Sequence, residues 1–149
     1  MQRLLRIFIG VILLSAGLAA QAASNKIIKV LPHYLDLKGR QSLAPSLFER
    51  DAYQAQLRKH PEQRSTMRFD VQWKAKGVDW SRLKMKVELR GSIKSGVVEQ
   101  AITRHGWWSY WIALTLDKQT YVDLGDIVAW RVTLWEGDTQ LAEQKSFLW

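Results

Sequence analysis

The sequence predicts an all-β protein, an antiparallel sandwich of about seven strands with one short helix inserted after the first strand. Two observations predict this class. Segments of alternating apolar and polar residues recur along the chain with short turns between them, and helices do not alternate with these segments. A segment near the C-terminus is apolar on both faces, as in a strand at the middle of a sheet. Two sheets that hide their apolar faces against each other satisfy both observations.

The first 22 residues predict an export signal. Arg3 and Arg6 precede the apolar run "IFIGVILLSAGLAA". Ala20, Gln21 and Ala22 then form the pattern of two small residues around any residue that is typical of a cleavage site. Cleavage between Ala22 and Ala23 leaves residues 23–149 as one sandwich domain. The run is shorter than the roughly 20 apolar residues that cross a bilayer, so an uncleaved anchor is the less favoured alternative. The chain contains no cysteine, which excludes a lipid-anchored cysteine, disulfides and thiol-based metal sites.

The segment after the signal predicts a strand from Lys26 to about Val30. It is rich in β-branched residues, and Pro32 restricts it to the edge of a sheet or ends it early.

A helix is expected over residues 47–59, within an insert near 46–60. Ser46 and Glu49 have the spacing of a capping box, and Pro61 disfavours helical geometry at the residue before it. Its apolar stripe, which we expect to dock onto the domain, consists of Phe48, Ala52 and Ala55, with Tyr53 and Leu57 beside it.

Two well-alternating segments, 67–75 and 82–90, predict a hairpin. Gly77 and Asp79 lie between them and are typical turn residues. One face of this hairpin would be apolar and the other basic. The candidate basic face consists of Arg68, Lys74, Arg82, Lys84, Lys86 and Arg90, with Asp70 and Glu88 partly neutralising it.

Four further strands are expected in the second half of the chain. They cover residues 97–103, the aromatic stretch "HGWWSYWIAL", the segment "DIVAWRVTLW" and, after an "EGDT" turn, "QLAEQKSFLW". Asp117, Asp123 and Asp126 are interpreted as turn and strand-end residues.

Residues 123–138, "DLGDIVAWRVTLWEGD", resemble the penultimate strand of fibronectin-type-III and related immunoglobulin-like domains of bacterial exported proteins. The residues that carry the resemblance are Leu124, Gly125, Trp130, Arg131, Val132 and Gly137. The tyrosine usual at the start of this strand is replaced by Ile127, although Tyr121 lies nearby. The resemblance implies an immunoglobulin-like sandwich.

The aromatic stretch raises the question of how so many rings are accommodated. If Trp108, Tyr110 and the following alternate residues point inward, Trp107 and Trp111 point outward, about 13 Å apart. Such a pair of indoles can stack sugar rings. Alternatively, the helical segment 40–65 covers them, and we favour this cover because exposed indoles are a liability unless they are used.

Charge is unevenly distributed. The formal net charge is +8, yet residues 26–94 hold 16 Lys and Arg against 7 Asp and Glu, whereas residues 95–149 hold 4 against 7. This asymmetry suggests an anionic partner such as a polysaccharide, a lipid headgroup or nucleic acid, but we favour the alternative that the basic face is simply solvated and aids solubility. Nucleic acid is not expected, because the export signal directs the domain away from the cytoplasm and no nucleic-acid motif is present.

No catalytic motif is recognised. His33, His60 and His105 occur singly, without the short spacing of a metal site, and the chain has no nucleophile elbow, phosphate-binding glycine loop or HExxH. We therefore expect no enzyme activity, no cofactor and no metal.

A transmembrane β-barrel is an alternative, because barrel strands also alternate and the chain ends in Trp149. An odd number of strands, the helix, and the charges of Glu143 and Lys145 in the last strand disfavour it.

The expected function is a small, periplasmic or secreted, non-catalytic binding or assembly module of a bacterial envelope. Its partner would be a protein, for example one that pairs with the terminal strand, or an anionic polysaccharide. A membrane would be contacted only through an uncleaved signal, and the sequence predicts no oligomeric state. The alternatives are an envelope hydrolase or accessory enzyme subunit, and a purely structural surface protein.

Overall fold

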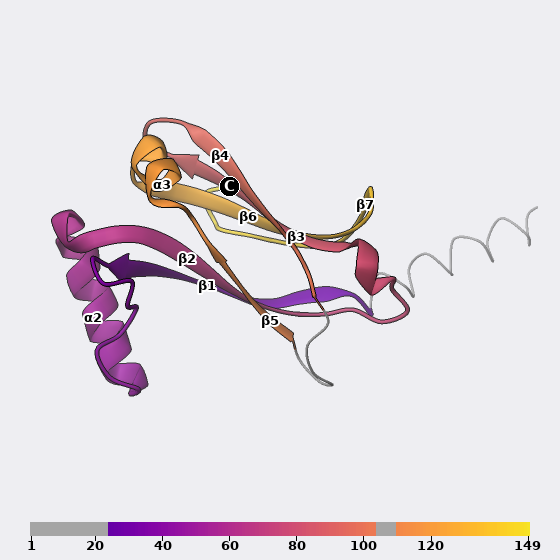
Figure 1. Cartoon of the computed structure of the whole chain (residues 1–149), viewed down its shortest axis with the longest axis horizontal. Helices are drawn as coiled ribbons and strands as arrows, with labels where there is room; N and C mark the ends of the chain where they lie inside the picture. Colours follow the sequence, from indigo (N-terminus) through magenta and orange to yellow (C-terminus); the bar gives the residue numbers. More distant parts are fainter. Residues whose placement is uncertain (1–23, 104–109) are drawn as a thin grey trace, which may run out of the picture.

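The strands form two antiparallel sheets. The computed structural model describes residues 24–103 and 110–149, which contain seven strands, so the signal and its cleavage site lie outside the described residues. The three-stranded sheet has the order β1-β2-β5, and the four-stranded sheet has the order β4-β3-β6-β7 (Figure 1). The strands are β1 (Lys26–Asp36), β2 (Arg64–Lys74), β3 (Leu83–Gly91), β4 (Ser95–Ala101), β5 (Tyr110–Thr115), β6 (Ile127–Glu136) and β7 (Thr139–Lys145).

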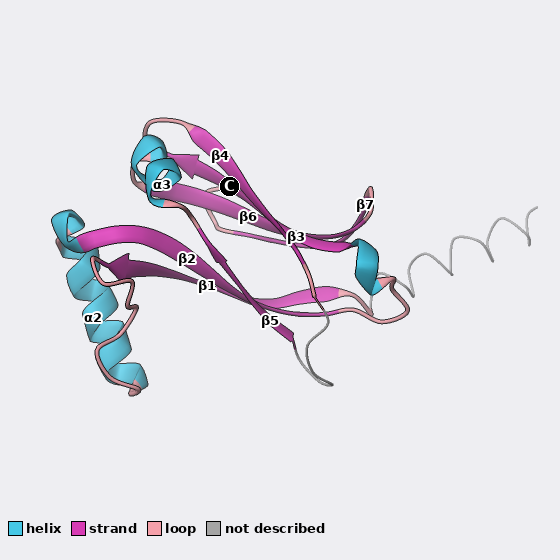
Figure 2. Ribbon diagram, in the orientation of Figure 1, coloured by secondary structure: helices cyan, strands magenta, loops and turns pink. Residues whose placement is uncertain are grey.

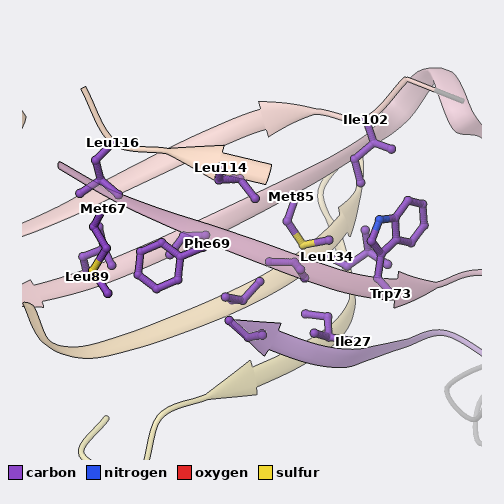
Figure 3. Packing of buried hydrophobic residues seen from close by; sticks show 14 of the residues in the cluster. Ile27, Met67, Phe69, Trp73, Met85, Leu89, Ile102, Leu114, Leu116 and Leu134 are labelled. Carbon is purple, nitrogen blue, oxygen red and sulfur yellow. The ribbon is translucent and has the colours of Figure 1, made fainter. Parts of the chain in front are cut away.

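The apolar faces of the two sheets pack against each other to form the core. Alternate residues of β2 and β3 are buried, and their neighbours along each strand are more exposed. This confirms the period-two pattern predicted for both segments, and burying each large apolar side chain contributes about 1.5–3 kcal/mol to stability. Figure 3 shows residues from both sheets in this core, among them Phe69, Trp73, Met85, Leu114 and Leu134.

The predicted hairpin between residues 67–75 and 82–90 is wrong. β2 and β3 belong to different sheets, and the residues between them cross from one sheet to the other. The crossing chain contains a short 3₁₀ helix, Trp80–Arg82, and the ring of Trp80 packs on Trp73 with a centroid distance of 5.7 Å. Two strands with one apolar face each can bury those faces by lying side by side or by facing each other, and here they face each other.

β1 is longer than expected, because it continues through Pro32 to Asp36. It lies at the edge of its sheet, paired only with β2 in the described chain. The N–H of Tyr34, two residues further along, donates to the side chain of Gln54 rather than to β2. The nitrogen of Pro32 therefore faces the same open edge, where its missing hydrogen removes no bond from the sheet.

The helix α2 (Leu47–Lys59) has the predicted bounds but a different docking side and a different N-terminus. Phe48 is 82% exposed, whereas Gln54 and Leu57 are the buried residues, so the predicted apolar stripe is wrong. In the described chain Ser46 makes no side-chain capping bond, so the capping box does not form. Figure 2 shows α2 at one end of the three-stranded sheet, beside the end of β1.

A second helix, α3 (Lys118–Leu124), was not expected. Asp117 caps it, because its side chain accepts a hydrogen bond from the N–H of Thr120, at 2.8 Å. Gly125 follows its last residue with a φ of 74°, a backbone conformation that glycine adopts readily because it has no Cβ. The interpretation of Asp123 as a turn or strand-end residue is wrong, because Asp123 lies within α3. Neither helix of the described chain is long and apolar enough to cross a membrane.

β6 confirms the prediction of a strand covered on both faces. It lies between β3 and β7, and its residues on both sides are buried, Val132 and Leu134 on the core side and Ala129 and Thr133 on the other.

A buried carboxylate joins α2 to the end of β1. Asp36 accepts hydrogen bonds from the backbone of Lys38 and Arg40, the guanidinium of Arg40 and the hydroxyl of Tyr53, at 2.7–2.9 Å. Burial alone would raise the pKa of Asp36, but these donors outweigh it and hold the pKa well below its usual range. Nearby, the amide of Gln54 bonds both backbone polar groups of Tyr34, as a neighbouring strand would.

We expect Asp36→Ala to lower the free energy of unfolding by about 2–4 kcal/mol at pH 7, because it leaves buried hydrogen-bond donors without an acceptor. A carboxylate with a depressed pKa stabilises the fold above its unfolded pKa of about 3.9, and this contribution is lost as the pH falls below that value. Urea unfolding at pH 7 and pH 3 measures both effects: the gap between wild type and variant should shrink at pH 3. Asp51→Ala, which removes an exposed carboxylate that contacts Arg50, is the control and should change stability little. An equal gap at both pH values would contradict this role.

Candidate binding site

The structure separates the six basic residues predicted to share one face. Arg68 and Lys74 lie on the outer face of the three-stranded sheet. Lys84, Lys86 and Arg90 lie on the outer face of the four-stranded sheet, and Arg82 belongs to the 3₁₀ helix between them. The single basic face is therefore wrong, for the same reason as the hairpin: β2 and β3 face each other across the core, so their outer faces point in opposite directions.

Most of these basic side chains also contact an acidic or aromatic side chain. Arg68 pairs with Asp70 at 2.9 Å, Lys84 with Glu99 at 3.3 Å and Lys86 with Glu88 at 3.6 Å. The guanidinium of Arg90 lies over the ring of Trp149, 4.3 Å from its centroid. These contacts neutralise or shield the positive charge on the four-stranded side.

A different basic surface is formed on the outer face of the three-stranded sheet. It consists of Lys26 and Lys29 from β1, Lys74 from β2 and Trp111 from β5, and we call it the lysine–tryptophan face. Lys26 opposes Lys74 in the β1–β2 register, Lys29 opposes Gln72, and Gln72 in turn opposes Trp111. Lys29 and Trp111 are thus two strand spacings apart, about 10 Å.

A β-bulge places both β1 lysines on this face. Lys26 and Lys29 are three residues apart and would point to opposite sides of a regular strand. The register shifts between Ile27 and Lys29, so that Ile28 is an extra residue. Ile27 then faces the core while Lys26 and Lys29 both face outward. Sequence alternation could not identify this pair, because the bulge interrupts the alternation.

The three lysines make no ion pair with any residue in 24–103 or 110–149. Lys26 and Lys74 lie directly opposite each other, an arrangement of like charges that destabilises a sheet. The exposed Lys76 follows in the chain and adds a fourth positive charge close by. Among the described residues, no ion pair neutralises the positive charge concentrated on this face.

The opposite end of the same outer face is covered. His33 is buried there, and burial lowers its pKa although Asp70 lies 3.4 Å away and favours the charged form. Arg68 donates to the side chain of Gln41 in the segment that leads to α2. The outer face is thus divided between a covered end beside α2 and an open end that carries the lysines.

Trp111 lies at the open end and is 52% exposed. The expectation that the helical segment covers the outward indoles is therefore wrong for Trp111, because Tyr53 and Gln54 anchor α2 to the far end of β1. The outward direction predicted for Trp111 is correct. Trp107, its predicted companion, lies outside the described residues.

A cleft of about 310 Å³ lies next to the lysine–tryptophan face, between the edge strands β4 and β5. Trp73 forms part of its wall and belongs to an aromatic cluster with Trp80 and Tyr110, with centroid distances of 4.9–5.7 Å. The cleft is lined by Trp73, Gln100, Ala101, Ile102, Thr103, Tyr110, Trp111, Ile112 and Ala113. Trp111 therefore belongs both to the cleft and to the face.

The described residues contain no group of three or more His, Asp or Glu side chains that could hold a metal ion. Of the three histidines, His33 is buried beside Asp70 and His60 contacts Glu62 on the surface. His105 lies outside the described residues.

We expect Lys74→Glu to raise the free energy of unfolding by about 0.5 kcal/mol, because it converts the Lys26–Lys74 repulsion into an attraction. Lys84→Glu is the matched control. It removes the pairing with Glu99 and should lower stability slightly. Urea unfolding at low ionic strength compares the two variants, and a change of the same sign in both would contradict the repulsion.

Comparisons with protein-family models, with curated proteins and with solved structures found no match. The function is therefore inferred from the side chains of the lysine–tryptophan face and the adjoining cleft.

Proposed function

We propose that this chain is an exported, non-catalytic binding module of a bacterial envelope, and that its lysine–tryptophan face holds an acidic polysaccharide. One observation carries the proposal: three lysines without an ion pair in the described chain lie on the same outer face as a half-exposed indole, and one of them, Lys29, is in register with it through Gln72. The lysines supply charge complementarity, and the indole supplies a flat apolar surface. Export and a periplasmic or secreted location rest on the pattern of residues 1–22 alone.

An acidic polysaccharide suits this surface better than a compact anion. The face extends over three strands, and its positive charges are separated along and across them. A polymer with repeated carboxylates can contact several lysines at once, and a sugar ring can lie flat on Trp111. Retaining the unfavourable Lys26–Lys74 pair in the free protein is understandable if a bound anion relieves it.

A protein partner that pairs with the terminal strand has less support. β7 is an edge strand of the four-stranded sheet, as that alternative requires, but β1 packs beside it on this side of the molecule. The edge strands β4 and β5 on the other side are separated by the cleft.

The immunoglobulin-like character of the fold is part of the proposal. In such domains the first, second and fifth strands share one sheet, and the third, sixth and seventh share the other. The same grouping occurs here, with β4 added beside β3. This grouping supports the resemblance of residues 123–138 to the penultimate strand of those domains.

The charge requirement is tested with a double variant of residues 23–149. We expect Lys26→Gln with Lys74→Gln to elute from heparin and alginate columns at lower salt than wild type. The matched control, Lys84→Gln with Lys86→Gln, removes the same charge from the opposite sheet and should elute close to wild type. Equal losses in both variants would mean that only net charge matters. No retention of wild type on either column would overturn the proposal.

The role of the indole is tested with Trp111→Ala. Its half-exposed side chain adds little to the core, so the melting temperature should change by less than about 3 °C. Binding to alginate fragments, measured by calorimetry, should weaken several-fold because a sugar ring loses its stacking surface. A large fall in melting temperature with unchanged affinity would assign Trp111 a structural role instead.

A further inference from the structure

The covered end of the outer face buries an ionisable side chain. His33 lies opposite Arg68 in the β1–β2 register, so both side chains share the outer face of the three-stranded sheet with Lys74. His33 is only 6% exposed, and a side chain on an outer face is buried only if another segment lies over it. The segment between β1 and α2 reaches this place, because Gln41 accepts a hydrogen bond from Arg68 at 2.6 Å. We call residues 37–59, which comprise this segment and α2, the cover.

The charged groups that act on His33 belong to both the sheet and the cover. Burial lowers the pKa of His33, and Asp70, at 3.4 Å, opposes this shift. Arg50 and Arg68 lower the pKa further, and Asp51 has a smaller, opposite effect. Asp70 and Arg68 lie on β2, whereas Arg50 and Asp51 lie on α2. The covered arrangement therefore favours neutral His33, mainly because the charged ring would lose its hydration.

Displacing the cover would reverse this preference. Water would reach His33, and Arg50 would leave with α2, while Asp70 would stay beside His33 on the sheet. Both changes raise the pKa of His33 and outweigh the departure of Asp51, so the uncovered arrangement binds the proton more tightly. By linkage, the uncovered population rises as the pH falls below the ordinary histidine pKa of about 6.5.

The attachment of the cover is weakest at the end near His33. Figure 1 shows α2 beside the end of β1, projecting away from the four-stranded sheet. Tyr53 and Gln54 hold this part of the cover by hydrogen bonds to β1, and Phe48 is exposed. Near the C-terminal end of α2, Leu57 is fully buried and its carbonyl accepts a hydrogen bond from Arg64. The N-terminal part of the cover can therefore separate while the C-terminal end of α2 remains attached.

Release would lengthen the lysine–tryptophan face. Arg68 and Lys74 are six residues apart on the same side of β2, which corresponds to about 20 Å. The charges of Arg68 and Asp70 cancel each other, so this end is neutral when His33 is neutral. Protonated His33 gives it a net positive charge. A polymer that follows β2 can then contact cations at both ends of the outer face.

We propose that residues 37–59 form an acid-released cover, and that protonation of His33 releases it and adds His33 and Arg68 to the lysine–tryptophan face. This inference rests on the proposed function, because it describes the regulation of the same binding face. It predicts that acidic polysaccharides bind more tightly in mildly acidic surroundings than at neutral pH.

Hydrogen exchange of one backbone amide reports on the cover. The N–H of Tyr34 donates to the side chain of Gln54 at 2.8 Å, so it loses its partner when α2 leaves. The N–H of Leu116 donates to the carbonyl of Met67 and is the reference for opening of the sheet itself. Between pH 7.5 and pH 5.5, after correction for the intrinsic exchange rate, the protection of Tyr34 should fall several-fold. The protection of Leu116 should stay constant.

Two histidine variants assign the effect. His33→Gln keeps a polar side chain that cannot be protonated, so the protection of Tyr34 should no longer depend on pH. His60→Gln is the matched control, because it removes an exposed histidine that contacts Glu62, and it should behave as wild type. If His33→Gln does not fold, exchange in the wild-type protein still decides whether acid opens the cover.

Calorimetry with alginate oligosaccharides tests the consequence for binding. Uronic acid carboxylates remain charged at pH 5.5, so the ligand keeps its charge over this range. The affinity of wild type should rise about twofold to fivefold between pH 7.5 and pH 5.5, the gain expected from one exposed ion pair. His33→Gln should bind as wild type does at pH 7.5 and show no such rise.

The outcomes separate this inference from the function on which it rests. Constant protection of Tyr34 in wild type, or an equal fall in His33→Gln, would overturn the acid-released cover. A fall in protection without a rise in alginate affinity would overturn the extension of the face to His33 and Arg68. Absence of alginate binding at both pH values would overturn the proposed function, whereas hydrogen exchange would still decide the release of the cover.

Discussion

The burial of β2 against β3 across the core is the constraint on which the rest of the structure depends. Phe69, Val71 and Trp73 on one strand and Met85 and Val87 on the other are buried almost completely. Because these side chains meet face to face, the two strands must belong to different sheets. The polar residues that alternate with the buried ones along each strand must then point to opposite outer surfaces. The distribution of charge over the molecule follows from this packing.

The functional surface arises where regular alternation is broken. The extra residue at Ile28 turns Lys29 to the same side as Lys26, opposite Lys74 and beside the strand that carries Trp111. A bulge at the end of an edge strand disturbs few hydrogen bonds, so the chain can reorient a side chain there at small cost. On the four-stranded sheet Lys84 and Lys86 instead lie close to Glu99 and Glu88, and the two signs pair with each other.

The two sides of the molecule where the edge strands lie differ from each other. On one side β1 and β7 lie close together, and Gln54 satisfies the backbone of Tyr34 at the exposed edge. On the other side β4 and β5 leave a cleft with Trp73 in its wall. The opposed Lys26 and Lys74 lie at the same end of the three-stranded sheet as this cleft.

The sequence by itself determined part of the local structure of this chain. Period-two patterning identified the strands at 67–75 and 82–90 and which of their side chains are buried, and Pro61 with Ser46 marked the bounds of α2. These features depend on neighbours within a few residues. The tertiary structure alone decided which strands share a sheet, because a strand with one apolar face buries it equally well beside or opposite a similar strand. It also decided that Lys26, Lys29, Lys74 and Trp111 lie together and that α2 leaves Trp111 exposed. The first depends on a bulge and the second on a helix anchored by Asp36 and Gln54, and both require contacts between residues far apart in the chain.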